Sequence, residues 1–202
     1  SRSDILVVVN PASGIRTLQE LLDKARAQPG MLSYASGGVG TPSHLGVELM
    51  LSEANVSALH VPYKGASELV NAVLGNQVAF GMPIFGVAYP QVQAGKLRAL
   101  AVAGPRRNPL LPQVPTLVEL GMKDLVLVSW GGISVPRATP DAVVARVEAA
   151  FAQAMKGPKL IASLQEQGAV VDVQNSATYT AGFRREMALT ETMMQRARLE
   201  PM

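Results

Sequence analysis

Residues 33–44 read SYASGGVGTPSH, and this order of residue types predicts a short strand, a glycine-rich turn and the start of a helix. Thr41 has a side chain that helix N-caps prefer. Pro42 suits the first helical position, because that position needs no backbone N–H donor. The succession therefore indicates one strand-to-helix unit of an α/β fold.

The turn between this strand and this helix combines glycines with hydroxyl side chains. Gly37, Gly38 and Gly40 let the backbone come close to a ligand, and Ser36 and Thr41 flank them. A helix N-terminus also carries unpaired N–H groups and a partial positive charge. We therefore predict that these five residues bind an anion; the alternative is a tight connection that binds nothing.

A second turn of the same kind follows at residues 60–67, which read HVPYKGAS. It adds a lysine and two hydroxyl groups, so the two turns together predict a protein that binds a small acid. We expect Tyr63 on the wall of a ligand cleft and Lys64 near its mouth. The alternative places Tyr63 against a neighbouring helix and Lys64 in solvent.

Strand and helix signals alternate along the first half of the chain. Strands are predicted at 5–9, 32–35, 58–61, 78–82 and 97–102, and helices at 17–28, 41–54, 67–74 and 87–94. Thr17 and Glu20 form a capping box at the start of the first helix. This alternation predicts a mostly parallel sheet covered by helices, in which ligands bind at the carboxyl ends of the strands.

The second half of the chain is mainly helical. A proline-rich loop at 104–115 leads to predictions of a short helix at 116–121, a strand at 125–128, helices at 139–156 and 158–167, a strand-like segment at 170–173 and a last helix ending near 198. Thr139 is expected to cap its helix, with Pro140 as the first helical residue. These helices lack strands of their own, so they either cover the first unit or belong to an incomplete second lobe. In the second case Val143, Val144, Val147 and Phe151 are exposed and favour a homodimer.

Composition narrows the classes of function. The 202 residues are 48% hydrophobic and 16% charged, with a net charge of +3 and no dense run of lysine or arginine, so we expect no nucleic-acid partner. The absence of cysteine excludes disulfides, thiolate chemistry and cysteine-based zinc sites. No apolar run is long enough to span a membrane. The mild positive charge is compatible with an anionic small molecule.

The two histidines do not indicate a metal site, because no acidic cluster accompanies them. His44 could reach an anion at the helix end, but we expect a half-exposed surface position, and His60 is expected to be a satisfied core or edge residue. The sequence also lacks a nucleophile elbow, a P-loop and a dinucleotide fingerprint. We therefore predict no metal, no cofactor and no catalytic residue.

Five segments, taken in order, resemble the Bug-type receptors, which are the extracytoplasmic solute-binding proteins of tripartite tricarboxylate transporters. They are YAS at 34–36, the glycine-rich turn through His44 and Leu45, HVPYKG at 60–65, AGKLRALAV at 94–102 and VPT at 114–116. The similarity continues through Ser129-Trp130 and Thr139-Pro140 and extends over essentially the whole chain.

This resemblance implies a fold of the type II periplasmic-binding-protein class, with two α/β lobes around a cleft. Residues 1–128 correspond to one ligand-binding lobe, and residues 129–202 to a crossover and helices that return to a second lobe whose N-terminal part is expected to be absent. It further implies a periplasmic location, partner subunits in the membrane and a bound dicarboxylate or aromatic acid that is not transformed. The implied ligand contacts are Ser36, Gly37, Gly38, Gly40, Thr41, Tyr63 and Lys64.

Two other classes of function remain open at this point. A ligand-sensing effector domain of a regulator would have the same fold and act through dimerisation. An α/β enzyme would turn its ligand over, but Ser36 with His44 or His60 has no evident acidic partner.

Overall fold

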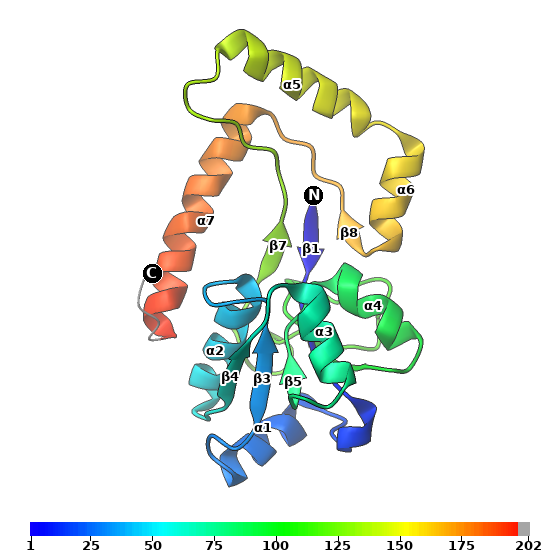
Figure 1. Ribbon diagram of the computed structural model, residues 1–202, viewed down its shortest axis with the longest axis vertical. Helices are drawn as coiled ribbons and strands as arrows, with labels where there is room; N and C mark the ends of the chain where they lie inside the picture. Colours follow the sequence, from blue (N-terminus) through cyan, green and yellow to red (C-terminus); the bar gives the residue numbers. More distant parts are fainter. Residues whose placement is uncertain (198–202) are drawn as a thin grey trace.

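The structure is a computed structural model that describes residues 1–197 (Figure 1). Figure 1 shows a lower α/β unit and an upper arch of three helices. The arch consists of α5 (Asp141–Ala154), α6 (Pro158–Glu166) and α7 (Ser176–Arg196). Between the two parts lies a three-stranded antiparallel sheet of β7 (Val128–Trp130), β1 (Arg2–Asp4) and β8 (Ala169–Val170). The chain enters and leaves the lower unit through β1 and β7.

The lower unit is built on a five-stranded mixed sheet. Its strands are, in spatial order, β4 (Leu59–Pro62), β3 (Ser33–Ser36), β5 (Phe80–Gly81), β2 (Leu6–Val9) and β6 (Arg98–Val102). β3 runs parallel to β4 and β5, whereas β2 runs antiparallel to β5 and β6. The predicted α/β fold with a mostly parallel sheet is therefore confirmed, with β2 as the strand that opposes the others.

Helices cover both faces of this sheet. They are α1 (Leu18–Ala27), α2 (Pro42–Ala54), α3 (Ala66–Leu74) and α4 (Phe85–Gln93), with a short 3-10 turn η1 (Pro11–Ser13) before α1. Val7 and Val9 of β2 pack with α1 and α2, whereas Leu6 and Val8 pack with α3 and α4. Because side chains alternate between the faces of a strand, a continuous apolar run is what a strand buried on both faces requires.

The upper arch buries much less of its apolar surface. No residue within α5, α6 or the described α7 is fully buried. Val143 and Val147 are 47% and 37% exposed, so the exposure predicted for them is confirmed. Val144 and Phe151 are half-buried instead. A homodimer through these helices stays a prediction.

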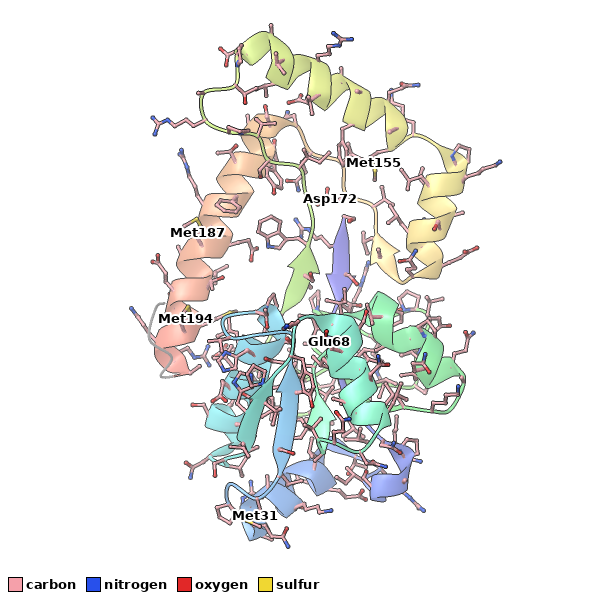
Figure 2. The ribbon with its side chains drawn as sticks, in the orientation of Figure 1. Met31, Glu68, Met155, Asp172, Met187 and Met194 are labelled. Atoms are coloured by element: carbon pink, nitrogen blue, oxygen red, sulfur yellow. The ribbon has the colours of Figure 1, made fainter. Side chains whose placement is uncertain are left out.

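The C-terminal end of α7 reaches back to the lower unit. Met193 and Met194 pack against the core that α1 and α2 cover, and Figure 2 shows Met194 at this end of the helix. Arg196 lies 3.8 Å from carboxylate oxygens of both Glu53 and Asp124. The arch is thus connected to the lower unit by side-chain packing as well as by the chain crossovers.

Two sequence predictions about helix starts are wrong. Residues 116–121 form a turn, not a helix: Thr116 and Glu119 exchange the bonds of a capping box, but the N–H of Leu117 donates to the carbonyl of Val102 at 2.9 Å and holds the segment against β6. At α5, Pro140 occupies the N-cap position rather than the first helical position.

The predicted domain boundary at residue 128 stays a prediction. In the structure β1, which precedes this boundary, pairs with β7, which begins at residue 128, and with β8, which follows it.

We expect the Gly81→Ala variant to be less stable than the wild type by about 1–3 kcal/mol, because an added Cβ overpacks the sheet. In β5 this Cβ would lie 2.9 Å from Cδ2 of Leu69 and 3.1 Å from the carbonyl oxygen of Ala35. Urea denaturation followed by circular dichroism measures the loss. The control is Gly131→Ala, whose Cβ would meet only Ser1 Oγ at 3.9 Å. Equal denaturation midpoints for the two variants would contradict this packing.

Candidate ligand-binding site

The two predicted strand-to-helix turns lie side by side at the carboxyl end of the sheet. β3 and β4 are parallel neighbours, and Ser36 at the end of β3 is in register with Pro62 at the end of β4. The turns start level with each other for this reason. A Cβ built on Gly37 would lie 3.4 Å from the carbonyl carbon of Gly65, so the two backbones are in close approach.

Glycine is required at three places in these turns. Gly38, Gly40 and Gly65 have φ values of +127°, +76° and +143°, which side chains with a Cβ rarely adopt. The glycines predicted as ligand contacts therefore have a clear structural role in shaping the first turn.

The first turn satisfies most of its own amides, which corrects the prediction of a ring of free N–H groups. The N–H of Gly37 donates to Ser43 Oγ at 2.9 Å, that of Gly38 to Ser36 Oγ at 3.1 Å, and that of Gly40 to His44 Nδ1 at 3.2 Å. These three glycine amides are engaged and cannot bind an anion without losing those bonds.

Thr41 is the N-cap of α2 by its backbone angles, but its side chain makes no capping hydrogen bond. Its hydroxyl donates instead to the carbonyl of Gly38 at 2.6 Å and lies 2.9 Å from Ser43 Oγ. Pro42 is confirmed at the first helical position and has no N–H. The hydroxyl predicted to cap the helix therefore stabilises the turn and leaves the helix end uncapped.

Two amides in the first turn of α2 and one in the preceding loop remain available. Within the described residues, the N–H groups of Val39, Ser43 and His44 meet no hydrogen-bond acceptor. The first turn of α2 also contains no acidic residue, so nothing there offsets the positive end of the helix. The sequence led us to predict the glycine amides as donors and to miss these amides. It does not show that the side chains of Ser43 and His44 fold back and accept the glycine N–H groups.

The start of α3 differs from that of α2 in its charge. Glu68 lies in the first turn of α3, as Figure 2 shows, and its carboxylate accepts the N–H of Lys64 at 3.0 Å. This carboxylate occupies the positive end of α3. An anion is therefore favoured at α2 and not at α3.

The structure separates the two predicted contacts in the second turn. The ring of Tyr63 packs against the core under α3 and α4, and its hydroxyl lies 3.3 Å from Gln77 Oε1, so the packing alternative describes this side chain. The Lys64 side chain is exposed. Ligand contact by either residue stays a prediction.

An imidazole pair lies directly behind the first turn. The rings of His44 and His60 stack with centroids 4.1 Å apart, and Tyr34 stacks on His60 at 4.9 Å. His60 Nε2 lies 2.6 Å from Ser36 Oγ, and the Tyr34 hydroxyl is bonded to Glu48. His60 is thus a satisfied edge residue as predicted, whereas the expected half-exposed position of His44 is wrong: only 5% of this residue is exposed.

Burial keeps the two imidazoles and the Tyr34 hydroxyl of this cluster uncharged. Burial, together with the smaller effect of the neighbouring His44, lowers the pKa of His60 to about 4. Burial also lowers the pKa of His44, although the Glu48 carboxylate acts in the opposite sense. The pKa of Tyr34 is raised by burial and by Glu48. At neutral pH both imidazoles are therefore neutral, as the N–H bond from Gly40 to His44 Nδ1 requires.

A separate cavity of about 380 Å³ lies in the upper part of the molecule, between the three-stranded sheet and helices α5 and α7. Trp130 lines it and makes edge-to-face contacts with Tyr179 and Phe183 at 5.8 and 5.6 Å between ring centroids. None of the residues of the two turns lines this cavity. Trp130 therefore packs against two aromatic rings beside the crossover and is not part of the turn site.

The described part of the chain contains no group of three or more histidine, cysteine and acidic residues that could bind a metal ion. Among the helices in that part, none has the length and apolar character needed to cross a membrane.

Comparison with known proteins extends over nearly the whole chain. Residues 1–198 match the family described as "Tripartite tricarboxylate transporter family receptor". A curated relative from Pseudomonas sp. strain P51, the UPF0065 protein in the tcbD-tcbE intergenic region, is 37% identical over 80% of this chain and 49% of its own length. A UPF0065 protein from Cupriavidus necator is 38% identical over 86% of this chain and 52% of its own length. The chain spans about half the length of the curated relatives it matches.

Solved structures agree in fold. The R. palustris protein Rpa4515 with adipate has a TM-score of 0.94 at 26% identity, over 100% of this chain and 68% of its own. The periplasmic binding protein BugD has a TM-score of 0.94 at 25% identity, over 98% and 67%. MatC from Rhodopseudomonas palustris with bound malate has a TM-score of 0.85 at 25% identity, over 97% and 65%. On the strength of the family match over residues 1–198, this chain belongs to the tripartite tricarboxylate transporter receptor family, and its fold is that of the periplasmic binding proteins.

Proposed function

We propose that this chain is the ligand-binding part of a periplasmic receptor that binds a small carboxylate, a dicarboxylate or an aromatic acid, and delivers it unchanged to the membrane subunits of a transport system. The observation that carries this proposal is the uncapped N-terminus of α2. The amides of Ser43 and His44 lie there without an acceptor, the amide of Val39 in the preceding loop also has none, and the first helical turn contains no acidic side chain. A carboxylate supplies the missing acceptor and the missing negative charge.

The chemistry of two structural neighbours supports the ligand class. One is described with adipate and another with malate, and both ligands are dicarboxylates. Uncharged amides suit a ligand that has to be released again, because they give a weaker bond than a buried arginine pair would. One carboxylate of such a ligand would bind at α2, and the other would bind groups outside this turn.

We assign different tasks to the seven predicted contact residues. The N–H groups of Val39, Ser43 and His44 replace the glycine amides as the donors to the carboxylate. Ser36, Thr41 and the three glycines of the turn hold these donors in place through the bonds described above. Lys64 adds positive charge at the rim, and Tyr63 supports the turn through its backbone, since its N–H donates to the carbonyl of Ser36 at 3.0 Å.

The proposal predicts saturable binding of carboxylates by the protein as its gene encodes it. Isothermal titration with adipate, malate, benzoate, phosphate and glucose should give a heat of binding for at least one of the three carboxylates and none for glucose. Ligand recovered after a long incubation should be unchanged by mass spectrometry. Binding of phosphate or glucose alone would overturn the ligand class, and a converted ligand would overturn the receptor assignment.

We further expect the Lys64→Met variant to bind the best of these carboxylates about twofold to fivefold more weakly, because an exposed charge near the mouth contributes less than about 1 kcal/mol. The loss should shrink at high salt, since the charge is screened. Lys96→Met is the matched control: it removes the same charge from another exposed position, between α4 and β6. Equal affinities for the two variants at low salt would remove Lys64 from the site.

A further inference from the structure

We propose that His44 and His60 are positioning residues of the ligand-binding turn, and that they hold it in its binding shape only as a pair of neutral imidazoles. The inference rests on the proposed function, because it assigns to these two side chains the control of anion affinity at α2. Charging either ring should open the turn and weaken binding. The argument stands on two hydrogen bonds and one ring stack.

The first hydrogen bond fixes the tautomer of His44. The N–H of Gly40 donates to His44 Nδ1 at 3.2 Å, so Nδ1 carries no proton and the ring proton is on Nε2. A second proton on Nδ1 would face the N–H of Gly40, and the bond would be lost. Gly40 directly precedes the N-cap residue Thr41, so this bond sets the path by which the chain enters α2.

The second hydrogen bond connects His60 to the other end of the turn. Ser36 Oγ lies 2.6 Å from His60 Nε2 and 3.1 Å from the carbonyl oxygen of Gly38. The proposal takes the tautomer in which Nε2 of neutral His60 carries no proton and accepts the hydroxyl of Ser36. An imidazolium has an N–H at Nε2 and cannot accept, so a charged His60 would rotate the hydroxyl of Ser36. The same oxygen accepts the N–H of Gly38, and the turn would lose its present geometry.

The stack makes the two rings act together. Their centroids are 4.1 Å apart with an angle of 15° between the planes, so two positive charges there would repel strongly in a buried setting. Glu48 on α2 and Tyr34 on β3 are the other titratable groups that contact or act on this pair within residues 1–197. Glu48 favours a charged His44, but its carboxylate is bonded to Tyr34, and burial of both rings opposes charging.

If the two histidines acted on the ligand only through charge attraction, the effect of acidification on binding would have the opposite sign. An imidazolium behind the turn would attract an anion, so acidification would strengthen binding if the histidines acted by charge. If they act by position, acidification weakens binding. The sign of the pH effect therefore distinguishes the two roles.

The test uses paired substitutions in the protein as its gene encodes it. His44→Asn places an amide oxygen where Nδ1 lies, and His60→Gln places an amide group where Nε2 lies, so both keep the hydrogen bond and neither can become charged. His44→Ala and His60→Ala remove the bonds. Adipate and malate are titrated by calorimetry between about pH 7 and about pH 3.5, a range that includes the ordinary histidine pKa and the pKa of about 4 of His60.

At about pH 7 we expect the Asn and Gln variants to bind within about twofold of the wild type, and the Ala variants about tenfold more weakly, the effect of one lost hydrogen bond. The ligand's own protonation cancels in the ratio of wild-type affinity to that of the His44→Asn, His60→Gln double variant. This ratio should fall several-fold on acidification. A constant or rising ratio, or Ala variants that bind like the wild type, would overturn the inference.

Leu45→Ala is the control for loss of packing. Leu45 is 4% exposed, it follows His44 in the same helix, and its side chain makes none of the turn's hydrogen bonds. This variant should unfold at a lower temperature but retain the wild-type pH profile of binding. If Leu45→Ala changed the pH profile of binding as His44→Ala and His60→Ala do, the changes in the histidine variants would be explained by loss of packing alone.

A measurement without ligand separates this inference from the proposed function. Nitrogen-15 NMR of the histidine rings should show Nδ1 of His44 unprotonated at neutral pH, and the amide resonance of Gly40 should shift as His44 becomes charged. A protonated Nδ1, or a Gly40 resonance that ignores the titration, would overturn the positioning role even if a carboxylate binds. Absence of binding with the expected NMR result would overturn the function and leave the role in the turn standing.

Discussion

The parallel pairing of β3 with β4 is the constraint on which the candidate site depends. Because Ser36 and Pro62 are in register, both strands end at one level and both turns begin there. The same register brings His60 of β4 beside Tyr34 and within reach of Ser36. A shift of β4 by one residue would turn His60 to the other face of the sheet and leave Ser36 and His44 without this partner.

Satisfaction of the backbone amides decides which part of the turn can bind an anion. Each glycine amide of the first turn has an acceptor supplied by a nearby side chain, from Ser36, Ser43 or His44. Pro42 removes one donor, and the remaining ones at the start of α2 have no acceptor in the described residues. At α3 the carboxylate of Glu68 already fills the corresponding place. The two helix starts thus differ in what they can attract.

The sequence was sufficient for features that depend on neighbours along the chain and insufficient for those that depend on distant ones. Apolar runs located the five strands of the lower unit but not β1, and Thr17 caps α1 by accepting the N–H of Glu20, as predicted. Thr116 accepts the N–H of Glu119 in the same way, yet no helix follows, because Leu117 is held by Val102 of β6. His44 on α2 was expected at the surface because its stacking partner, His60, lies on β4, which the chain reaches only after that helix has ended. The family resemblance, which depends on several ordered segments, was confirmed.

The distribution of charge around the turn fits a receptor better than a site that transforms its ligand. The groups nearest the free amides are neutral: hydroxyls, glycine carbonyls and two imidazoles whose pKa values are lowered by burial. Catalysis by proton transfer favours a group whose pKa lies near the working pH, and His60, with a pKa of about 4, does not meet that condition at neutral pH. Neutral donors held in place without a strong base can bind a carboxylate and let it go. In the neighbouring turn the Lys64 side chain is exposed, and an exposed charge acts more on the rate of association than on the stability of the bound state.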